Sequence, residues 1–151
     1  MSIRPTHGLL VLTLGLTCIL VRAEAKPPEH KCPVVIDHVE LGYNHQGGES
    51  KPQLRVGFGN NAGKQISAVT FSLSVLDSGG NPQPYPDNLT YGDGLENGKK
   101  KIFAWDLAFE SVEVHPAGET VVVQKVEFAD ATIWTDDGSE SCVLTVDFHA
   151  K

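Results

Sequence analysis

The sequence predicts an all-β protein, an immunoglobulin-like antiparallel β-sandwich of about seven strands in a single domain. Three observations support this prediction. Apolar and polar residues alternate over short segments, turn-forming residues separate these segments, and no sustained helical periodicity occurs outside the N-terminal region. With 151 residues and 40% apolar content, the chain is long enough for one hydrophobic core. A small β-barrel is the alternative architecture.

The clearest strand covers residues 68–75, where apolar and polar side chains alternate at every position. One face carries Val69, Phe71, Leu73 and Val75, and the other carries Thr70, Ser72 and Ser74. A strand with one dry and one wet face is typical of an antiparallel sheet that packs against a second sheet. The other strands are therefore expected to supply a matching apolar face.

Two strands are expected before this segment. The first covers residues 33–43, and Asp37 with His38 interrupts its alternation, which predicts a β-bulge or a change of sheet. The second covers residues 53–59. Residues 60–63 are Asn-Asn-Ala-Gly, which tolerate positive φ and predict a turn into the clearest strand.

Beyond residue 76 the chain first becomes rich in turn residues. Pro84 and Pro86 argue against a central strand before Leu89. The later strands are expected at residues 101–107, 120–128, 132–134 and 142–148, with an irregular segment at 111–119 and a tight reversal at 130–131. Trp105 is predicted to be the aromatic centre of the core, because a buried indole contributes a large apolar area.

The N-terminal region is typical of a cleavable signal peptide. An arginine near the start is followed by an apolar run over residues 8–21 and by the small residues Ala23 and Ala25 at the expected cleavage site. A membrane anchor is the alternative, but the run is shorter than the roughly 20 residues that a spanning helix needs. The predicted organisation is a signal peptide at 1–25, a leader at 26–32 and one sandwich domain at 33–151. The processed protein is expected to be secreted or periplasmic, without stable membrane insertion.

Charge excludes one class of partner. Removal of the signal takes away two basic residues and one acidic residue, so the net charge goes from −7 to −8. Phosphate backbones require a basic surface, and the only basic run is Lys99-Lys100-Lys101. Nucleic acid is therefore not expected as a partner, and the lysines are interpreted as a solvated turn and strand edge.

Cys32 and Cys142 are the two cysteines that remain after signal cleavage, and in an exported protein they predict a disulfide. This bond would tie the two ends of the domain together and restrict the unfolded chain by about 4–5 kcal/mol in the entropic model. A metal or redox site that uses Cys32 with His30 is the alternative, although no C-x-x-C spacing is present.

The motifs of common catalytic sites are absent from the sequence. There is no G-x-S-x-G elbow, and the glycine-rich stretches connect strands without a following helix that could cradle a phosphate. Histidines such as His38, His45 and His115 could meet in space, but each is also an ordinary loop or surface residue. Catalysis is therefore not expected, and no cofactor is indicated.

An acidic loop near the C-terminus suggests one metal site. Asp136, Asp137 and Glu140 cluster in a glycine-containing segment, and calcium prefers several oxygen ligands. The spacing departs from the twelve-residue calcium loop. A solvated turn without metal is therefore the preferred interpretation, and no metal site is expected.

Three tyrosines suggest a contact surface. Tyr43, Tyr85 and Tyr91 lie near the long connections 44–50 and 77–88, where binding residues of a sandwich commonly occur. They could form an aromatic patch for a protein or a glycan, or they could be half-buried at strand ends. The tripeptide Asn88-Leu89-Thr90 is also an N-glycosylation pattern, which matters only in a glycosylating secretory pathway.

Two segments carry a resemblance to a known family. Residues 56–64, a strand followed by an Asn/Gly turn, and residues 69–80, an alternating strand that ends in Asp77 and a glycine turn, look like the core hairpin of small bacterial exported immunoglobulin-like domains of the FxLYD type. The segment from Phe128 to Cys142 is similar to the endings of uncharacterised secreted bacterial proteins. The resemblance implies an extracytoplasmic accessory or interaction domain without catalysis, and it carries over no functional residue.

Together these observations predict an exported, non-catalytic binding or structural module. Its partner is expected to be an extracytoplasmic protein or a glycan. One alternative is a small secreted hydrolase or metal-dependent enzyme with a site built from loops. The other is an inhibitor or a ligand carrier.

Overall fold

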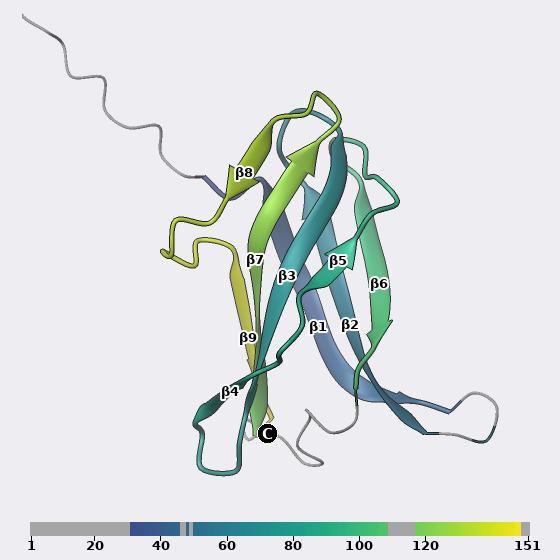
Figure 1. Ribbon diagram of the computed structural model, residues 1–151, viewed down its shortest axis with the longest axis vertical. Coiled ribbons are helices and arrows are strands. Elements are labelled where there is room, and N and C mark those ends of the chain that lie inside the picture. Colours follow the sequence, from purple (N-terminus) through teal and green to yellow (C-terminus); the bar gives the residue numbers. More distant parts are fainter. Residues whose placement is uncertain (1–30, 46–47, 49, 109–116, 149–151) are drawn as a thin grey trace, which may run out of the picture.

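The computed structural model describes residues 31–45, 48, 50–108 and 117–148. Within these ranges the chain is all-β, without helices, and its strands form two antiparallel sheets that face each other as a sandwich (Figure 1). The fold class predicted from the sequence is confirmed. The predicted signal peptide at 1–25 and all but the end of the leader lie outside the described residues.

Nine strands form within the described part of the chain. The first sheet has the order β1-β2-β6 and contains β1 (Val34–Asn44), β2 (Lys51–Asn60) and β6 (Lys100–Asp106). The second sheet contains β3 (Ile66–Leu76), β4 (Pro82–Pro84), β5 (Leu89–Tyr91), β7 (Gly118–Phe128), β8 (Ile133–Thr135) and β9 (Val143–Asp147). In it, β7 pairs with β3 on one side and with β8 and β9 on the other.

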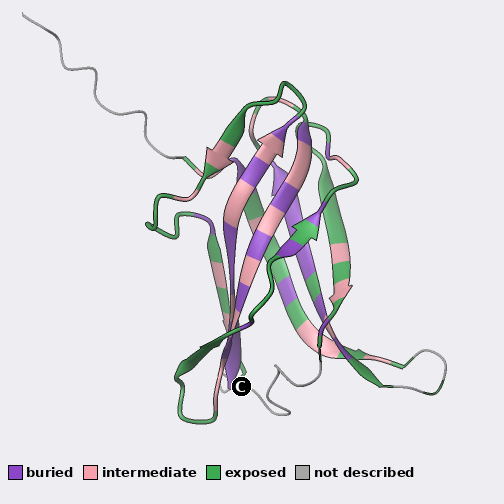
Figure 2. Ribbon diagram, viewed as in Figure 1, coloured by how far each residue is buried: buried purple, intermediate pink, exposed green. Residues whose placement is uncertain are grey.

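The core lies between the two sheets, as the alternation of residues 68–75 predicts. The purple bands of buried residues alternate with paler ones along β3 and β7 (Figure 2). The fully buried side chains include Leu54, Val56, Phe58, Ile66, Val69, Phe71, Leu73, Val121, Val123 and Val126. Every one of these side chains comes from β2, β3 or β7, so the central strands of the two sheets supply most of the core.

The predicted irregularity in the first strand is a β-bulge. The register between β1 and β2 shifts between Ile36 and His38, so Asp37 has no partner on β2. A side chain at Gly57 of β2 would meet this bulge, because an added Cβ would lie 2.8 Å from both Asp37 Oδ1 and His38 Cβ. The bulge therefore requires glycine at that position.

Two short strands and one strand start differ from the sequence prediction. The proline-containing segment adds β4 and β5 beside β3, so about seven expected strands become nine in the described residues. β4 is fully exposed, which fits the expectation that prolines exclude a central strand. The predicted irregular segment at 111–119 is wrong at its last two residues. Gly118 and Glu119 belong to β7 and pair with β3 on one side and with β9 on the other.

The aromatic centre of the core is not Trp105, so that prediction is wrong. Trp105 is half-buried at the margin of the sandwich, whereas Phe58 and Phe71 are fully buried and meet edge to face at 5.2 Å. The Trp105 indole nitrogen donates a hydrogen bond to the Thr90 carbonyl oxygen at 3.1 Å. Trp105 thus links β6 of one sheet to β5 of the other, and the bond supplies the acceptor that the indole needs.

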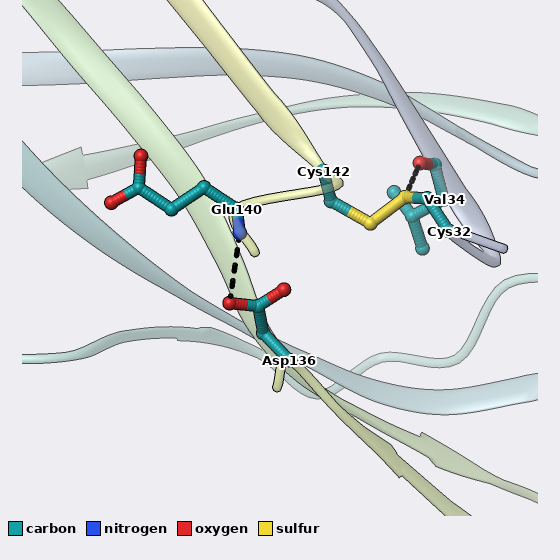
Figure 3. Close-up of a disulfide and its surroundings, with 5 residues drawn as sticks. All are labelled: Cys32, Val34, Asp136, Glu140 and Cys142. Carbon is teal, nitrogen blue, oxygen red and sulfur yellow. Dashed lines mark hydrogen bonds between the residues drawn. A yellow bond between two sulfur atoms is a disulfide. The ribbon is translucent and has the colours of Figure 1, made fainter. Parts of the chain in front are cut away.

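The disulfide joins Cys32, two residues before β1, to Cys142, directly before β9 (Figure 3). Their Cα atoms are 5.4 Å apart, and the bond connects the edge of one sheet to the edge of the other. The Cys32 sulfur also contacts the Val34 carbonyl oxygen. The predicted pairing is therefore the pairing in the structure, and it ties the first and last strands together.

Candidate functional site

The three predicted contact tyrosines do not form a patch. Tyr43 is 44% exposed, but Tyr85 is only 9% and Tyr91 only 3% exposed. The Tyr85 hydroxyl accepts a hydrogen bond from the Ala108 amide at 3.0 Å, and the Tyr91 hydroxyl donates one to the Gly94 carbonyl at 2.8 Å. The predicted patch is thus wrong for Tyr85 and Tyr91, because their rings close the core beside β5. Burial, with a smaller effect of Asp93, raises the pKa of Tyr91.

The acidic loop is organised by its own backbone. Asp136 Oδ2 accepts hydrogen bonds from the amides of Gly138 at 3.0 Å and Glu140 at 3.3 Å, and Asp137 Oδ1 accepts one from Ser139 at 3.0 Å. Figure 3 shows the Glu140 carboxylate directed away from Asp136. Within the described residues no three His, Cys, Asp or Glu side chains are grouped so that they could hold a metal ion. The arrangement supports a turn and does not support the calcium hypothesis.

The predicted histidines are separate. His38 Nε2 lies 3.6 Å from Glu40 Oε2, and the His45 ring stacks on Tyr43 with the ring centroids 6.5 Å apart. Neither imidazole hydrogen-bonds a serine hydroxyl within the ranges that the structure describes. His115 and His30 lie outside these ranges, so their predicted roles stay predictions.

A polar hollow lies on the outer face of the first sheet, toward the end of the β1–β2 hairpin that projects from the sandwich at the lower right of Figure 1. It has a volume of about 160 Å³. Its walls are formed by Glu40, Gly42, Tyr43, Asn44, His45, Gln53 and Arg55. Tyr43 is the one member of the predicted contact patch that lies here.

The register of the hairpin explains the hollow. Leu41 pairs with Leu54 and points inward, so the flanking pairs Glu40–Arg55 and Gly42–Gln53 point outward. An added Cβ at Gly42 would have no heavy atom within 4 Å. The missing side chain at Gly42 therefore leaves an open floor between polar neighbours.

Opposite charges compensate each other in the hollow. Arg55 Nη1 lies 3.8 Å from Glu40 Oε2, and both side chains are more than half exposed. The Gln53 side-chain amide nitrogen donates a hydrogen bond of 2.9 Å to Asp106 Oδ1 on β6. This bond holds the Gln53 side-chain amide in place, and the amide keeps a carbonyl oxygen that can accept a hydrogen bond.

Two aromatic rings lie on the other face of the same hairpin, because Tyr43 and His45 alternate with Gly42 and Asn44. Tyr43 and His45 stack with an interplanar angle of 26°, and Tyr43 is among the exposed large hydrophobic side chains of the described chain. The hollow itself thus combines one guanidinium, one carboxylate and two amides. A few convergent polar groups of this kind are typical of recognition sites.

A second hollow, of about 170 Å³, lies over the disulfide. It is lined mainly by apolar side chains of β1 and β9, which include Val35 and Val143, both about half exposed. It contains no charged side chain. It therefore offers a contact surface but few groups that could orient a ligand.

A carboxyl group that the sequence reasoning missed is buried beneath the first hollow. Glu119 on β7 is fully buried, and its Oε1 accepts a hydrogen bond from the Leu41 amide on β1. Its Oε2 has no hydrogen-bond partner among the described residues. The pKa of Glu119 is raised to about 7. Burial is the main cause; the hydrogen bond from the Leu41 amide acts in the opposite direction, and the nearby charge of Glu40 adds to the rise. A lone acidic residue in an apolar segment, Ala117-Gly118-Glu119-Thr120-Val121, is the signal that could have indicated it.

Comparisons with known proteins show the fold alone. No family model and no curated protein matches this chain. A crystal structure of a hypothetical protein from Peptoclostridium difficile 630 is similar, with 12% sequence identity and a TM-score of 0.54. The similarity covers 73% of this chain and 89% of that chain. No helix in the described ranges is long and apolar enough to cross a bilayer.

Proposed function

We propose that this protein is an exported, non-catalytic binding module whose contact site is the polar hollow on β1 and β2. The hollow is the observation that carries the proposal, because it brings several polar side chains, one of them held by a hydrogen bond, to one open place. The disulfide and the buried core supply a stable frame for it. The sequence resemblance to exported immunoglobulin-like domains is consistent with this function.

The chemistry of the hollow favours recognition over reaction. Glu40 and Arg55 are exposed, and the charge of each is opposed by the other. A general acid or base needs a group held at the reacting atom, usually with a pKa shifted by burial or by a like charge. The hollow is also open to solvent, which disfavours a carrier that must enclose its ligand.

A substitution at Gly42 tests the proposal. Valine at this position suits a strand and would fill the hollow from its floor, because no atom lies within 4 Å of the added Cβ. The processed protein and its Gly42→Val variant serve as bait for material from the native envelope or medium. Ser74→Val, on the outer face of β3, is the matched control, since it adds the same kind of side chain to the other sheet.

The expected result is a partner recovered by the original protein and by Ser74→Val, but not by Gly42→Val. Equal recovery of the partner by Gly42→Val would show that the contact site lies outside the hollow. Recovery of no partner, together with turnover of a substrate from a hydrolase panel, would overturn the proposal in favour of an enzyme.

A further inference from the structure

We infer that this protein forms a dimer in which the free edge of β6 pairs, in antiparallel orientation, with β6 of a second copy. The inference concerns a surface other than the hollow and does not depend on the proposed function. It follows from the place of β6 in its sheet, the backbone groups that this strand leaves unpaired, and the distribution of charge along it.

β6 is an edge strand with a regular backbone. It pairs with β2 and ends the first sheet, so its other side faces no strand in the part of the chain that the structure describes (Figure 1). Its register with β2 runs without a bulge over seven residues. At the other edge of this sheet, β1 is bulged at Asp37, and its Leu41 amide is bonded to Glu119. The first sheet therefore has one closed edge and one open edge.

Backbone groups on alternate residues of β6 point away from β2. The Leu107 amide donates to the Pro52 carbonyl at 2.8 Å, and the Asn60 amide donates to the Lys99 carbonyl at 3.0 Å. Hydrogen-bonded pairs alternate along an antiparallel ladder, so the odd-numbered residues of β6 bond to β2. The residues that direct their amides and carbonyls to the free edge are then the even-numbered ones, Lys100, Ile102, Ala104 and Asp106. Such unpaired edges are templates for pairing with another chain.

The charged side chains at the two ends of β6 lean over their own sheet. Lys100 Nζ bonds Asp37 Oδ2 on β1 at 2.6 Å. The Asp106 carboxylate accepts the 2.9 Å hydrogen bond from Gln53 on β2. Charged side chains commonly protect an edge strand from pairing, but these two are directed away from the free edge. The edge is therefore accessible to a second strand.

The order of charges along β6 selects a second copy as the partner. When the strand pairs with itself about Phe103, Lys100 of each copy lies opposite Asp106 of the other, and Ile102 lies opposite Ala104. Every residue with free backbone groups is then paired, and each pair exchanges two backbone hydrogen bonds. Opposite charges directly across a ladder attract each other. A shift of the register by two residues would lose both lysine–aspartate pairs.

The same pairing covers an exposed apolar side chain. Ile102 is 64% exposed, more than any other large hydrophobic side chain of the described residues. In the dimer it lies beside Ala104 of the second copy, whose small side chain leaves room for it. On the other face of the strand, Lys101 lies opposite the half-buried Trp105 of the second copy, and an ammonium group attracts an indole ring.

The symmetry of this dimer has a functional consequence. Its twofold axis is perpendicular to the sheet, so two three-stranded sheets become one continuous sheet with the outer faces of both copies on the same side. Both hollows then face the same way. If the hollow is the contact site, the dimer can hold a repetitive partner at two places and gain affinity without a new contact.

Sedimentation equilibrium of the oxidised, processed protein tests the inference, at concentrations from about 1 μM to about 1 mM. The expected result is a reversible equilibrium between monomer and dimer. Hydrogen exchange followed by NMR should slow at the Ile102 and Ala104 amides when the dimer forms and should recover on dilution. Ala104→Pro removes one amide from the free edge and no bond to β2, so it should weaken dimerisation at least tenfold. Thermal unfolding verifies that each variant folds.

A charge exchange tests the register. Lys100→Asp sets an aspartate opposite Asp106 of the second copy, and Asp106→Lys sets a lysine opposite Lys100, so each variant alone should dimerise roughly tenfold more weakly at low salt. Mixed in equal amounts, the two variants should form a heterodimer about as readily as the original protein dimerises, because opposite charges again face each other. Native mass spectrometry separates the species. Lys125→Asp on β7 is the matched control, since it makes the same charge change on the other sheet and should leave the dimer intact.

The inference would be overturned by a protein that stays monomeric up to about 1 mM, by a dimer that a folded Ala104→Pro leaves unchanged, or by failure of the two charge variants to form the heterodimer. If Ala104→Pro does not fold, the charge exchange decides the question alone. If the protein stays monomeric and an extended peptide of different sequence protects the Ile102 and Ala104 amides, the edge binds another chain and the dimer is refuted.

Discussion

The Leu41 amide on β1 donates a hydrogen bond to Glu119 Oε1 on β7, with 3.2 Å between nitrogen and oxygen. β1 is an edge strand, so the amides on the side away from β2 need partners outside their own sheet. Leu41 stands between Glu40 and Gly42, which line the hollow on the opposite face. One buried carboxyl therefore connects the strand beneath the candidate site to the other sheet.

This arrangement predicts that stability falls as the pH rises from about 4.5 to about 7. Burial raises the folded-state pKa of Glu119 from 4.5 to about 7, so in this window the folded protein binds more protons than the unfolded chain. The contribution is complete below the unfolded pKa and is lost above the folded pKa. The loss amounts to roughly 3 kcal/mol, since one pKa unit corresponds to about 1.4 kcal/mol. Urea unfolding at a series of pH values measures it.

Glu119→Gln is the matched variant for this effect. Glutamine keeps an acceptor for the Leu41 amide but carries no charge, so its stability should change much less between pH 4.5 and 7. Above pH 7 the variant should be the more stable protein. Parallel stability curves for the two proteins would contradict the assigned pKa.

The disulfide predicts a large loss of stability on reduction. It closes a loop with a sequence separation of 110 residues, for which the entropic model gives about 5 kcal/mol. The double variant Cys32→Ser/Cys142→Ser should therefore unfold at a clearly lower denaturant concentration than the oxidised protein, and reductant should have little effect on it. A thiol count on the unreduced processed protein should find no free cysteine. Two free thiols would show that Cys32 and Cys142 are not joined in the protein.

The glycines of β2 and β1 predict opposite responses to alanine. At Gly57 an added Cβ would lie 2.8 Å from Asp37 Oδ1 and from His38 Cβ, so Gly57→Ala should displace the bulge and cost about 1–3 kcal/mol. Gly42 has no such neighbour, and Gly42→Ala should be neutral or should stabilise by up to about 1 kcal/mol. Chemical denaturation measures both values. Equal effects at the two positions would show that the bulge tolerates a side chain opposite it.

The fold could be predicted further than the site. Strict alternation over residues 68–75 identified β3, the interruption at Asp37 identified the bulge, and the reversal at 130–131 holds in the structure, where Ala131 has a φ of 64°. These features depend on residues that are neighbours in the sequence. Local pattern is therefore sufficient to predict them.

The hollow depends on register, which local pattern does not provide. Glu40 and Arg55 meet because of the length of the hairpin and the position of the bulge, and a shift by one residue would turn both side chains to the other face. Tyr85 and Tyr91 were misplaced for a related reason. Near strand ends, only the three-dimensional course of the chain decides whether a ring covers the core or meets solvent.

Asn60 predicts the largest effect of a single turn residue. This fully buried side chain donates to the Lys64 carbonyl at 2.9 Å and to the Leu95 carbonyl at 2.8 Å, and it accepts from the Ala62 amide at 2.9 Å. Asn60→Ala removes three hydrogen bonds, of which only the one to the Leu95 carbonyl leaves a second donor, the Ile66 amide, in place. The substitution should destabilise the protein by about 2–4 kcal/mol. Asn61→Ala is the matched control, because the Asn61 side chain is exposed and only its backbone amide is bonded, to Pro33. Denaturant unfolding should separate the two variants clearly, since the Asn60 amide joins the turn after β2 to the segment before β6. A difference below about 0.5 kcal/mol would show that water replaces the Asn60 amide at all three groups.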